Sequence, residues 1–200
     1  MRADRLWFLV IAAMVTSSGI AGGQTRAPSA AERMQASSPE TDELTRRTGT
    51  WDVVSTVQLA PEAAPIVTRG IVAERVMVGR YLQETMHPAS ASDPAFTRLA
   101  FQYYDRVAGR WQYVSMDTRF PVGIMPARSF GPEEGRVLRL EFDDIAFVGL
   151  GVAVEGRTLH SNLVITRDTD EHEVLQQYMI AADGTARRWL AVTYEYTRRR

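Results

Sequence analysis

The stretch "GTWDVVSTVQL", residues 49 to 59, decides the fold that this sequence predicts. From Trp51 to Leu59 the side chains alternate between two faces, and the odd-numbered face is the more apolar. A period of two residues is typical of a β-strand with one buried face, whereas a helix repeats every 3.6 residues. The stretch therefore predicts a strand over 51–59, and Pro61 and Pro65 predict a turn after it.

The segment before this strand, "SSPETDELTRRTG", carries the signals of one short helix. Ser38 is suited to cap the helix, and Pro39 to occupy its first position, because proline lacks the N–H that would go unpaired there. Acidic residues follow in the first turn, and Arg46 and Arg47 lie in the last turn, where they complement the helix dipole. Gly49 then predicts the end of the helix.

After residue 59 the period stays close to two for the rest of the chain. Gly79, Gly109 and the pair Asp183-Gly184 are turn signals between such segments. Many short strands with frequent turns are typical of a sandwich or a barrel. We expect an all-β fold, an antiparallel up-and-down barrel of about ten strands, closed so that no edge is exposed and plugged at one end by the helix. After 51–59, the expected strands are 66–77, 80–88, 96–105, 111–118, 122–130, 136–142, 158–167, 172–181 and 185–197.

The first residues predict export. Arg2 and Arg5 belong to a short basic start, an apolar run extends from Leu6 to Val15, and small residues follow. This is the pattern of a cleaved signal peptide, here residues 1–23. A membrane-spanning helix needs about 20 apolar residues, roughly twice the length of this run. We therefore expect no membrane span after cleavage, and a periplasmic or secreted protein.

Two further parts complete the expected domain organisation. Residues 24–37 consist mainly of Ala, Ser, Gln, Thr and Pro, which predicts a flexible linker. Residues 38–200 have the length of a single domain, which we expect to be the barrel.

Composition excludes several kinds of chemistry. The 200 residues contain no Cys, which removes disulfides, thiolate nucleophiles, thiolate metal sites and a lipid anchor on cysteine. All 23 basic residues are Arg, so neither a Schiff-base lysine nor a P-loop lysine is available. The formal net charge of −1 gives no indication of nucleic-acid binding.

Several short motifs resemble a known family. The Gly-x-Trp start formed by Gly49 and Trp51 is similar to that of lipocalin-like (calycin) barrels, in which the tryptophan closes the barrel floor. With the other motifs it resembles the bacterial family called domain of unknown function 1579, over roughly residues 43–199. The resemblance implies a lipocalin-like β-barrel and brings no activity or cofactor with it. The other motifs are "VGRYLQE" (78–84), "YYD" (103–105), "WQYVSMD" (111–117) and "RRWLAVTYEYTRR" (187–199).

The hairpin "YYDRVAGRWQYVSMD", residues 103 to 117, provides candidates for the wall of a binding site. Tyr103 and Asp105 share one face of its first strand, and Trp111, Tyr113 and Asp117 share one face of its second. With both faces inward, the two carboxylates would lie at neighbouring strand ends beside aromatic rings, where the pKa of a carboxylate rises. The alternative is structural: Asp105 starts a turn, and Asp117 ends a strand with a local hydrogen bond to the backbone.

Other strands add to this set. With Tyr81, Gln83 and Thr85 facing inward, a ligand would meet a phenol, an amide and a hydroxyl. On the last strand the even-numbered residues from Leu190 onward make the more convincing inward face, so Trp189 has the least support among the candidates. The candidate ligand-binding residues are Trp51, Tyr81, Gln83, Tyr103, Asp105, Trp111, Tyr113, Asp117, Tyr178 and Trp189.

No metal or cofactor is expected. His87, His160 and His172 fall on three different predicted strands without HxH or HExxH spacing, and we expect them to be solvated surface residues. The chain has no GxSxG motif, and "GLGVAVEG" (149–156) lacks the third glycine of a dinucleotide-binding loop. This apolar segment is either an exposed loop at the barrel mouth or a buried strand.

These observations favour a binding protein over an enzyme. We expect a small hydrophobic or amphipathic ligand inside the barrel and no nucleic-acid partner, and the sequence leaves the oligomeric state open. One alternative is a cofactor-independent enzyme that uses Asp105 or Asp117 as a general base. Another is a ligand-free structural or interaction module with a filled interior. An open cavity lined by the candidate residues would favour binding.

Overall fold

The chain divides into two compact units, Met1–Ala36 and Ser37–Arg200. In the first unit, the backbone N–H of Ser29 donates to Oε2 of Glu32 (2.5 Å), and that of Glu32 donates to Oγ of Ser29 (3.2 Å). Among the described residues, no helix is both long and apolar enough to cross a membrane. The computed structural model describes residues 27, 29, 31–32, 36–120, 122–131, 136–147, 157–182 and 187–200. Predictions outside these residues are the signal peptide over 1–23, most of the linker over 24–37, the Asp183-Gly184 turn and the segment 149–156.

The second unit is all-β apart from one short helix, α2 (Pro39–Arg46). Its strands follow the predicted ranges closely except β6, which is shorter than the predicted 122–130, and β8 was not expected, because three residues are too few to show alternation. The strands are β1 (Gly49–Val57), β2 (Ile66–Val78), β3 (Tyr81–Pro88), β4 (Arg98–Asp105), β5 (Arg110–Asp117), β6 (Met125–Arg128), β7 (Val137–Phe142), β8 (Ile145–Phe147), β9 (Arg157–Arg167), β10 (His172–Ala181) and β11 (Arg188–Arg198).

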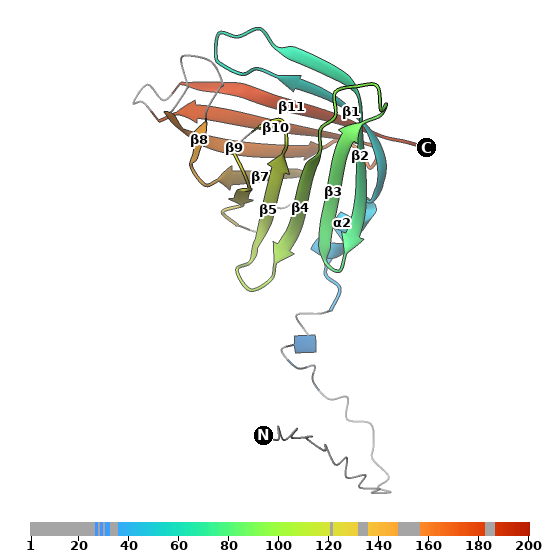
Figure 1. Ribbon diagram of the computed structural model, residues 1–200. Helices are drawn as coiled ribbons and strands as arrows, with labels where there is room; N and C mark the ends of the chain where they lie inside the picture. Colours follow the sequence, from blue (N-terminus) through green and yellow to red (C-terminus); the bar gives the residue numbers. More distant parts are fainter. Residues whose placement is uncertain are drawn as a thin grey trace, which may run out of the picture. The chain divides into compact units, whose positions relative to one another are not determined.

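Ten of these strands form a closed antiparallel ring (Figure 1). Each strand from β1 to β6 pairs with the next along the chain, and β7 pairs with β9. From there β9 pairs with β10, β10 with β11, and β11 with β1, which closes the ring. The short β8 continues the line of β7, because both pair with β9, at successive stretches of that strand. The expected closed barrel of about ten strands is therefore confirmed.

Helix α2 lies at the end of the barrel that holds the β2–β3 and β4–β5 hairpins (Figure 1). Its start follows the predicted signals: the side chain of Ser38 accepts a hydrogen bond from the N–H of Thr41 (3.3 Å), and Pro39 occupies the first turn. Leu44 is fully buried and joins the core of the barrel. Gly79 and Gly109 adopt positive φ angles of 61° and 64° in the two hairpins, a conformation that glycine adopts without strain.

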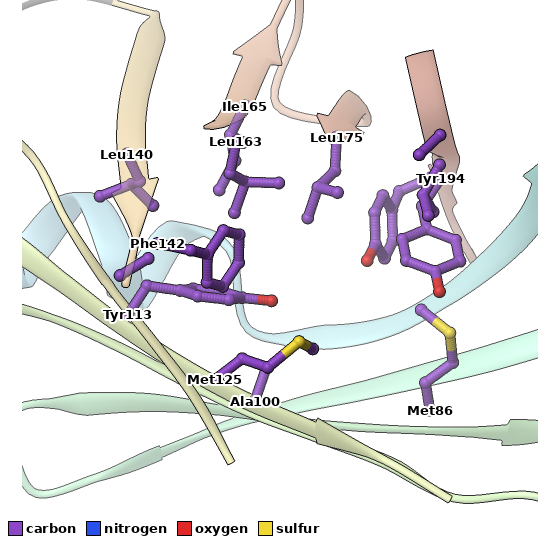
Figure 2. Packing of buried hydrophobic residues seen from close by; sticks show 14 of the residues in the cluster. Met86, Ala100, Tyr113, Met125, Leu140, Phe142, Leu163, Ile165, Leu175 and Tyr194 are labelled. Carbon is purple, nitrogen blue, oxygen red and sulfur yellow. The ribbon is translucent and has the colours of Figure 1, made fainter. Parts of the chain in front are cut away.

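Alternate residues of each strand point into the barrel. Figure 2 shows Leu163 and Leu175 on one wall pointing toward Tyr113 and Met125 on the other, and Met86 opposite Tyr194. The interior differs along the barrel axis: charged side chains fill the half beside α2, and apolar side chains line the other half. This division positions the candidate site.

A β-bulge in β11 changes which of its residues face inward. The register between β10 and β11 shifts after Gln177, so Ala191 is an extra residue in β11. An extra residue turns the side chains beyond it to the opposite face. Trp189 is consequently buried in the core, while Leu190 is half-buried on the outside. The predicted inward position of Leu190 is therefore wrong.

Candidate functional site

A row of five alternating charges crosses the half of the barrel beside α2. It begins at Arg47, directly after α2, whose Nη2 donates to Oε1 of Glu173 on β10 (3.0 Å). The same carboxylate oxygen accepts a hydrogen bond from Nη2 of Arg75 on β2 (2.9 Å). Arg75 Nε donates to Oε2 of Glu84 on β3 (2.8 Å), and Nη1 of Arg98 on β4 donates to Oε1 of Glu84 (2.5 Å). All five side chains are buried, so the row links α2 and three adjacent strands to β10 across the barrel.

Aromatic rings surround this row of charges. The guanidinium of Arg75 lies 4.3 Å from the ring centroid of Tyr196 and 4.9 Å from that of Trp51. The guanidinium of Arg98 lies 5.1 Å from the ring of Tyr194, and its Nη2 donates to the hydroxyl of Tyr113. Such contacts place part of each positive charge against a π face, which stabilises a cation that water does not reach.

Both carboxylates of the row are ionised. Burial alone raises the pKa of Glu173, but the nearby cations of Arg47 and Arg75 outweigh burial and lower the pKa to about 2. Burial likewise opposes ionisation of Glu84, and Arg75 and Arg98 hold the pKa of Glu84 below its ordinary value. The row is therefore a chain of ions at neutral pH.

A cavity occupies the half of the barrel away from α2. Its volume is about 40 Å³. Small-molecule sites typically enclose about 300–1,000 Å³, so this cavity is narrow, and a ligand of that size would enter it only if side chains of its wall move apart. Met125, Phe142, Leu163, Met179 and Val192 contribute to its apolar walls.

Polar groups face this cavity mainly where it meets the row of charges. Arg98 and Tyr113 line the cavity and also belong to the charged half, and Ser115 and Tyr194 lie beside them in its wall. Gln177 also lines the cavity and is fixed by a hydrogen bond from its Nε2 to Oγ of Ser161 (2.9 Å). The cavity therefore has long apolar walls and a polar, cationic inner end.

Arg119 separates this cavity from the surface. Its Nε and Nη2 donate to the two carboxylate oxygens of Asp117 (2.9 and 2.6 Å), and its Nη2 also donates to the hydroxyl of Tyr194 (3.1 Å). Asp117 and Tyr194 line the cavity, whereas Arg119 and Phe96 line a groove on the outside. The Arg119 guanidinium stacks on Phe96 at 3.9 Å, so these side chains form one layer of the barrel wall at this point.

The family model described as "Protein of unknown function (DUF1579)" matches residues 37–198. The chain belongs to this family. None of the curated proteins matches the chain. The DUF1579 description names no activity, so the chemistry of the site is inferred from its residues.

The structure places one predicted face of the DUF1579 barrel inside, as expected. Tyr113 and Asp117 on β5 line the cavity, and Trp111 on the same face is buried nearer the α2 end, where it packs edge-on against Tyr104. Trp51 is also buried, and its Nε1 donates to the backbone oxygen of Arg47 (3.2 Å). Trp51 and Trp111 are thus core residues beside the charged half and do not line the apolar cavity.

Four other candidates lie on the outer face of the barrel. Tyr81 is 43 % exposed and packs against the ring of Tyr103, with the centroids 4.8 Å apart. Gln83 lies on the same outer face of β3, and Tyr178 lies on the outer face of β10, beneath the guanidinium of Arg188. The predicted inward orientation of these side chains is therefore wrong.

The register of the hairpin explains this error. Tyr103 is paired with Gln112, whereas Tyr113 is paired with Gln102. Directly paired residues of antiparallel strands point to the same side of the sheet. Consequently the Tyr103 face and the Tyr113 face cannot both be inward.

The remaining two candidates have structural partners. Asp105 starts a turn, since its Oδ1 accepts hydrogen bonds from the N–H groups of Val107 and Ala108 (3.0 Å each). Trp189 donates from Nε1 to the backbone oxygen of Gln58 (3.1 Å) and is buried in the core. Neither side chain lines the apolar cavity.

The apolar and aromatic faces that strand alternation indicates do not predict the row of charges. A signal was nevertheless present in β3, where Glu84 stands between Leu82 and Met86 on the buried face. Likewise Arg75 follows the buried Ala73 on its face of β2. A single charge within an otherwise apolar face indicates a buried ion with a partner on another strand.

No metal centre is evident in the part of the chain that the structure describes, where no three His, Asp or Glu side chains converge. The three histidines each have a local partner: His87 Nδ1 contacts the backbone oxygen of Pro88 (2.7 Å), and His172 Nδ1 contacts Oδ2 of Asp168 (2.8 Å). His160 pairs with Asp144 on the exposed surface.

Replacing the central carboxylate of the row tests its structural role. Glu173→Gln removes the partner of two buried cations, so we expect the free energy of unfolding at pH 7 to fall by about 3–5 kcal/mol. Because the pKa of Glu173 is lower in the folded protein than in the unfolded chain, this carboxylate stabilises the fold fully above about pH 4.5 and progressively less as the pH falls toward 2. Urea unfolding between pH 7 and pH 2.5 should therefore show that the difference in free energy of unfolding between wild type and Glu173→Gln becomes smaller as the pH falls.

Glu195→Gln is the matched control, because Glu195 is exposed on the outer face of β11. We expect it to change the free energy of unfolding by less than about 0.5 kcal/mol. A gap between wild type and Glu173→Gln that stays constant across this pH range would contradict the assignment of Glu173 as an ion.

Proposed function

We propose that this protein binds a small apolar or amphipathic molecule inside its barrel. The observation that carries the proposal is the narrow apolar cavity that ends at Arg98 and Tyr113. Ligand sites commonly combine mostly apolar walls with a few fixed polar groups that orient the ligand. Both polar groups here are held by other members of the charged row, so they are pre-organised.

Binding is favoured over acid–base catalysis by the positions of the carboxylates. Both oxygens of Asp117 accept hydrogen bonds from Arg119, and Oδ1 of Asp105 holds the turn after β4. Glu84 and Glu173 are each shared between two guanidiniums. A general base needs an oxygen that is free to accept a proton from the substrate, and these contacts compete with that role.

Filling the cavity should weaken binding. Ala191 is buried and lines the cavity, so Ala191→Phe places a ring in the space that a ligand would occupy. We expect wild type to bind the neutral fluorescent probe N-phenyl-1-naphthylamine and Ala191→Phe to bind it at least about tenfold more weakly, measured by fluorescence titration.

Leu190→Phe is the matched control, because Leu190 lies next to Ala191 and on the outside of the barrel. It should bind the probe like wild type. Circular dichroism checks that Ala191→Phe and Leu190→Phe are folded. If folded Ala191→Phe binds the probe as tightly as wild type, the probe binds elsewhere, and the result argues against a cavity site.

Export is a second part of this proposal and rests on residues 1–23 of the sequence. We infer that the chain is made with a signal peptide and acts in the periplasm or outside the cell. N-terminal sequencing of the protein from cell fractions tests this: the account predicts an exported chain that starts near Gly22 or Gln24. Recovery of the full-length chain in the cytoplasm alone would contradict it.

A further inference from the structure

The charges that meet at the inner end of the cavity do not balance. The row from Arg47 to Arg98 contains three guanidiniums and two carboxylates, and the Arg119–Asp117 pair is joined to it through Tyr194. The connected set therefore carries one positive charge more than it has negative charges. Its phenols do not compensate, because burial raises the pKa values of Tyr113, Tyr194 and Tyr196.

Hydrogen-bond donors are also in excess in this set. In this set, the buried side-chain atoms without a hydrogen-bond partner among the described residues are three donors, Nε of Arg47, Nη1 of Arg75 and Nε2 of Gln102, and one acceptor, Oε2 of Glu173. Arg75 and Gln102 line a small hollow beside the row of charges, with a volume of about 20 Å³. Tyr113 and Leu175 line this hollow and also the apolar cavity, so the two spaces are neighbours within the barrel. The unpaired donors thus lie in the hollow next to the cavity, within the same connected set of charges.

A buried cation without a counter-ion is costly, because a low-dielectric interior replaces the water that would solvate it. The same low dielectric strengthens its attraction to any anion that enters. Arg98 is the member of the row that faces the apolar cavity. An anion on an apolar chain would supply the missing charge there and fill the remaining space with the chain.

We propose that the ligand is an amphipathic anion, a carboxylate on an unbranched apolar chain, whose head group binds at Arg98 and Tyr113. This inference rests on the proposed binding function and specifies the class of ligand. The chain extends from the head group past Met125 and Leu163 toward the mouth of the cavity. An unbranched chain is required because the cavity is narrow.

The test compares ligands that share one chain and differ in the head group. Decanoate, decanol and decyltrimethylammonium compete with bound N-phenyl-1-naphthylamine, and acetate controls for the head group alone. A hydrogen-bonded charge pair predicts that decanoate binds wild type about tenfold or more tightly than decanol. Decyltrimethylammonium should bind more weakly than decanol, and acetate should not displace the probe.

Two variants change the charge at the inner end in opposite directions. Asp117→Asn adds one positive charge, so it should increase the preference for decanoate over decanol by several-fold. Arg98→Gln removes the excess charge and should reduce this preference to near unity. Arg128→Gln is the matched control, because Arg128 lies on the outer surface and pairs there with Asp143, and it should behave like wild type.

Each outcome separates the two proposals. If decanol and decanoate bind equally well, the inference about the head group is overturned while the cavity site remains. If no compound displaces the probe, or the probe does not bind, the binding function itself is overturned. Should Arg98→Gln fail to fold, the head-group series on wild type and Asp117→Asn still decides the question.

Discussion

The row of alternating charges from Arg47 to Arg98 is the interaction on which the interior of this barrel depends. Each carboxylate is shared between two guanidiniums, so removing either carboxylate leaves buried cations without a counter-ion in a space that water hardly reaches. Because the row joins α2, β2, β3 and β4 to β10, it fixes the position of the helix and the inward faces of four strands together. A core of this kind favours one arrangement of the strands, since a shift by one residue would move Arg75 or Glu84 outside.

This constraint also divides the interior into two compartments. The ions and their aromatic neighbours fill the half beside α2, and the opposite half is left to apolar side chains that do not fill it completely. Arg98 belongs to both halves: it closes the row and faces the apolar cavity. The side chain that ends the stabilising row therefore also lines the cavity that we propose as the ligand site.

The sequence predicts the fold much better than the site. Alternation from Trp51 onward, the capping residues of α2 and the turn glycines are local signals, and they predicted the helix, the strands of the ring and its closure. Facing inward is not a local property: Tyr81 and Tyr103 are aromatic residues on the outer surface, while Glu84 and Arg98 are charged and buried. Their positions depend on partners that lie on other strands, and on a bulge at Ala191 that alternation does not reveal.

The central claim is that the cavity beside Arg98 holds an amphipathic anion. Native mass spectrometry of the protein purified from the cells that make it tests this most directly, with denaturing extraction to identify any released compound and Ala191→Phe measured in parallel. The account predicts a stoichiometric mass increase in wild type, a released carboxylate with an apolar chain, and no such increase in Ala191→Phe. A bare protein mass in wild type, or the same bound compound in both proteins, would contradict it.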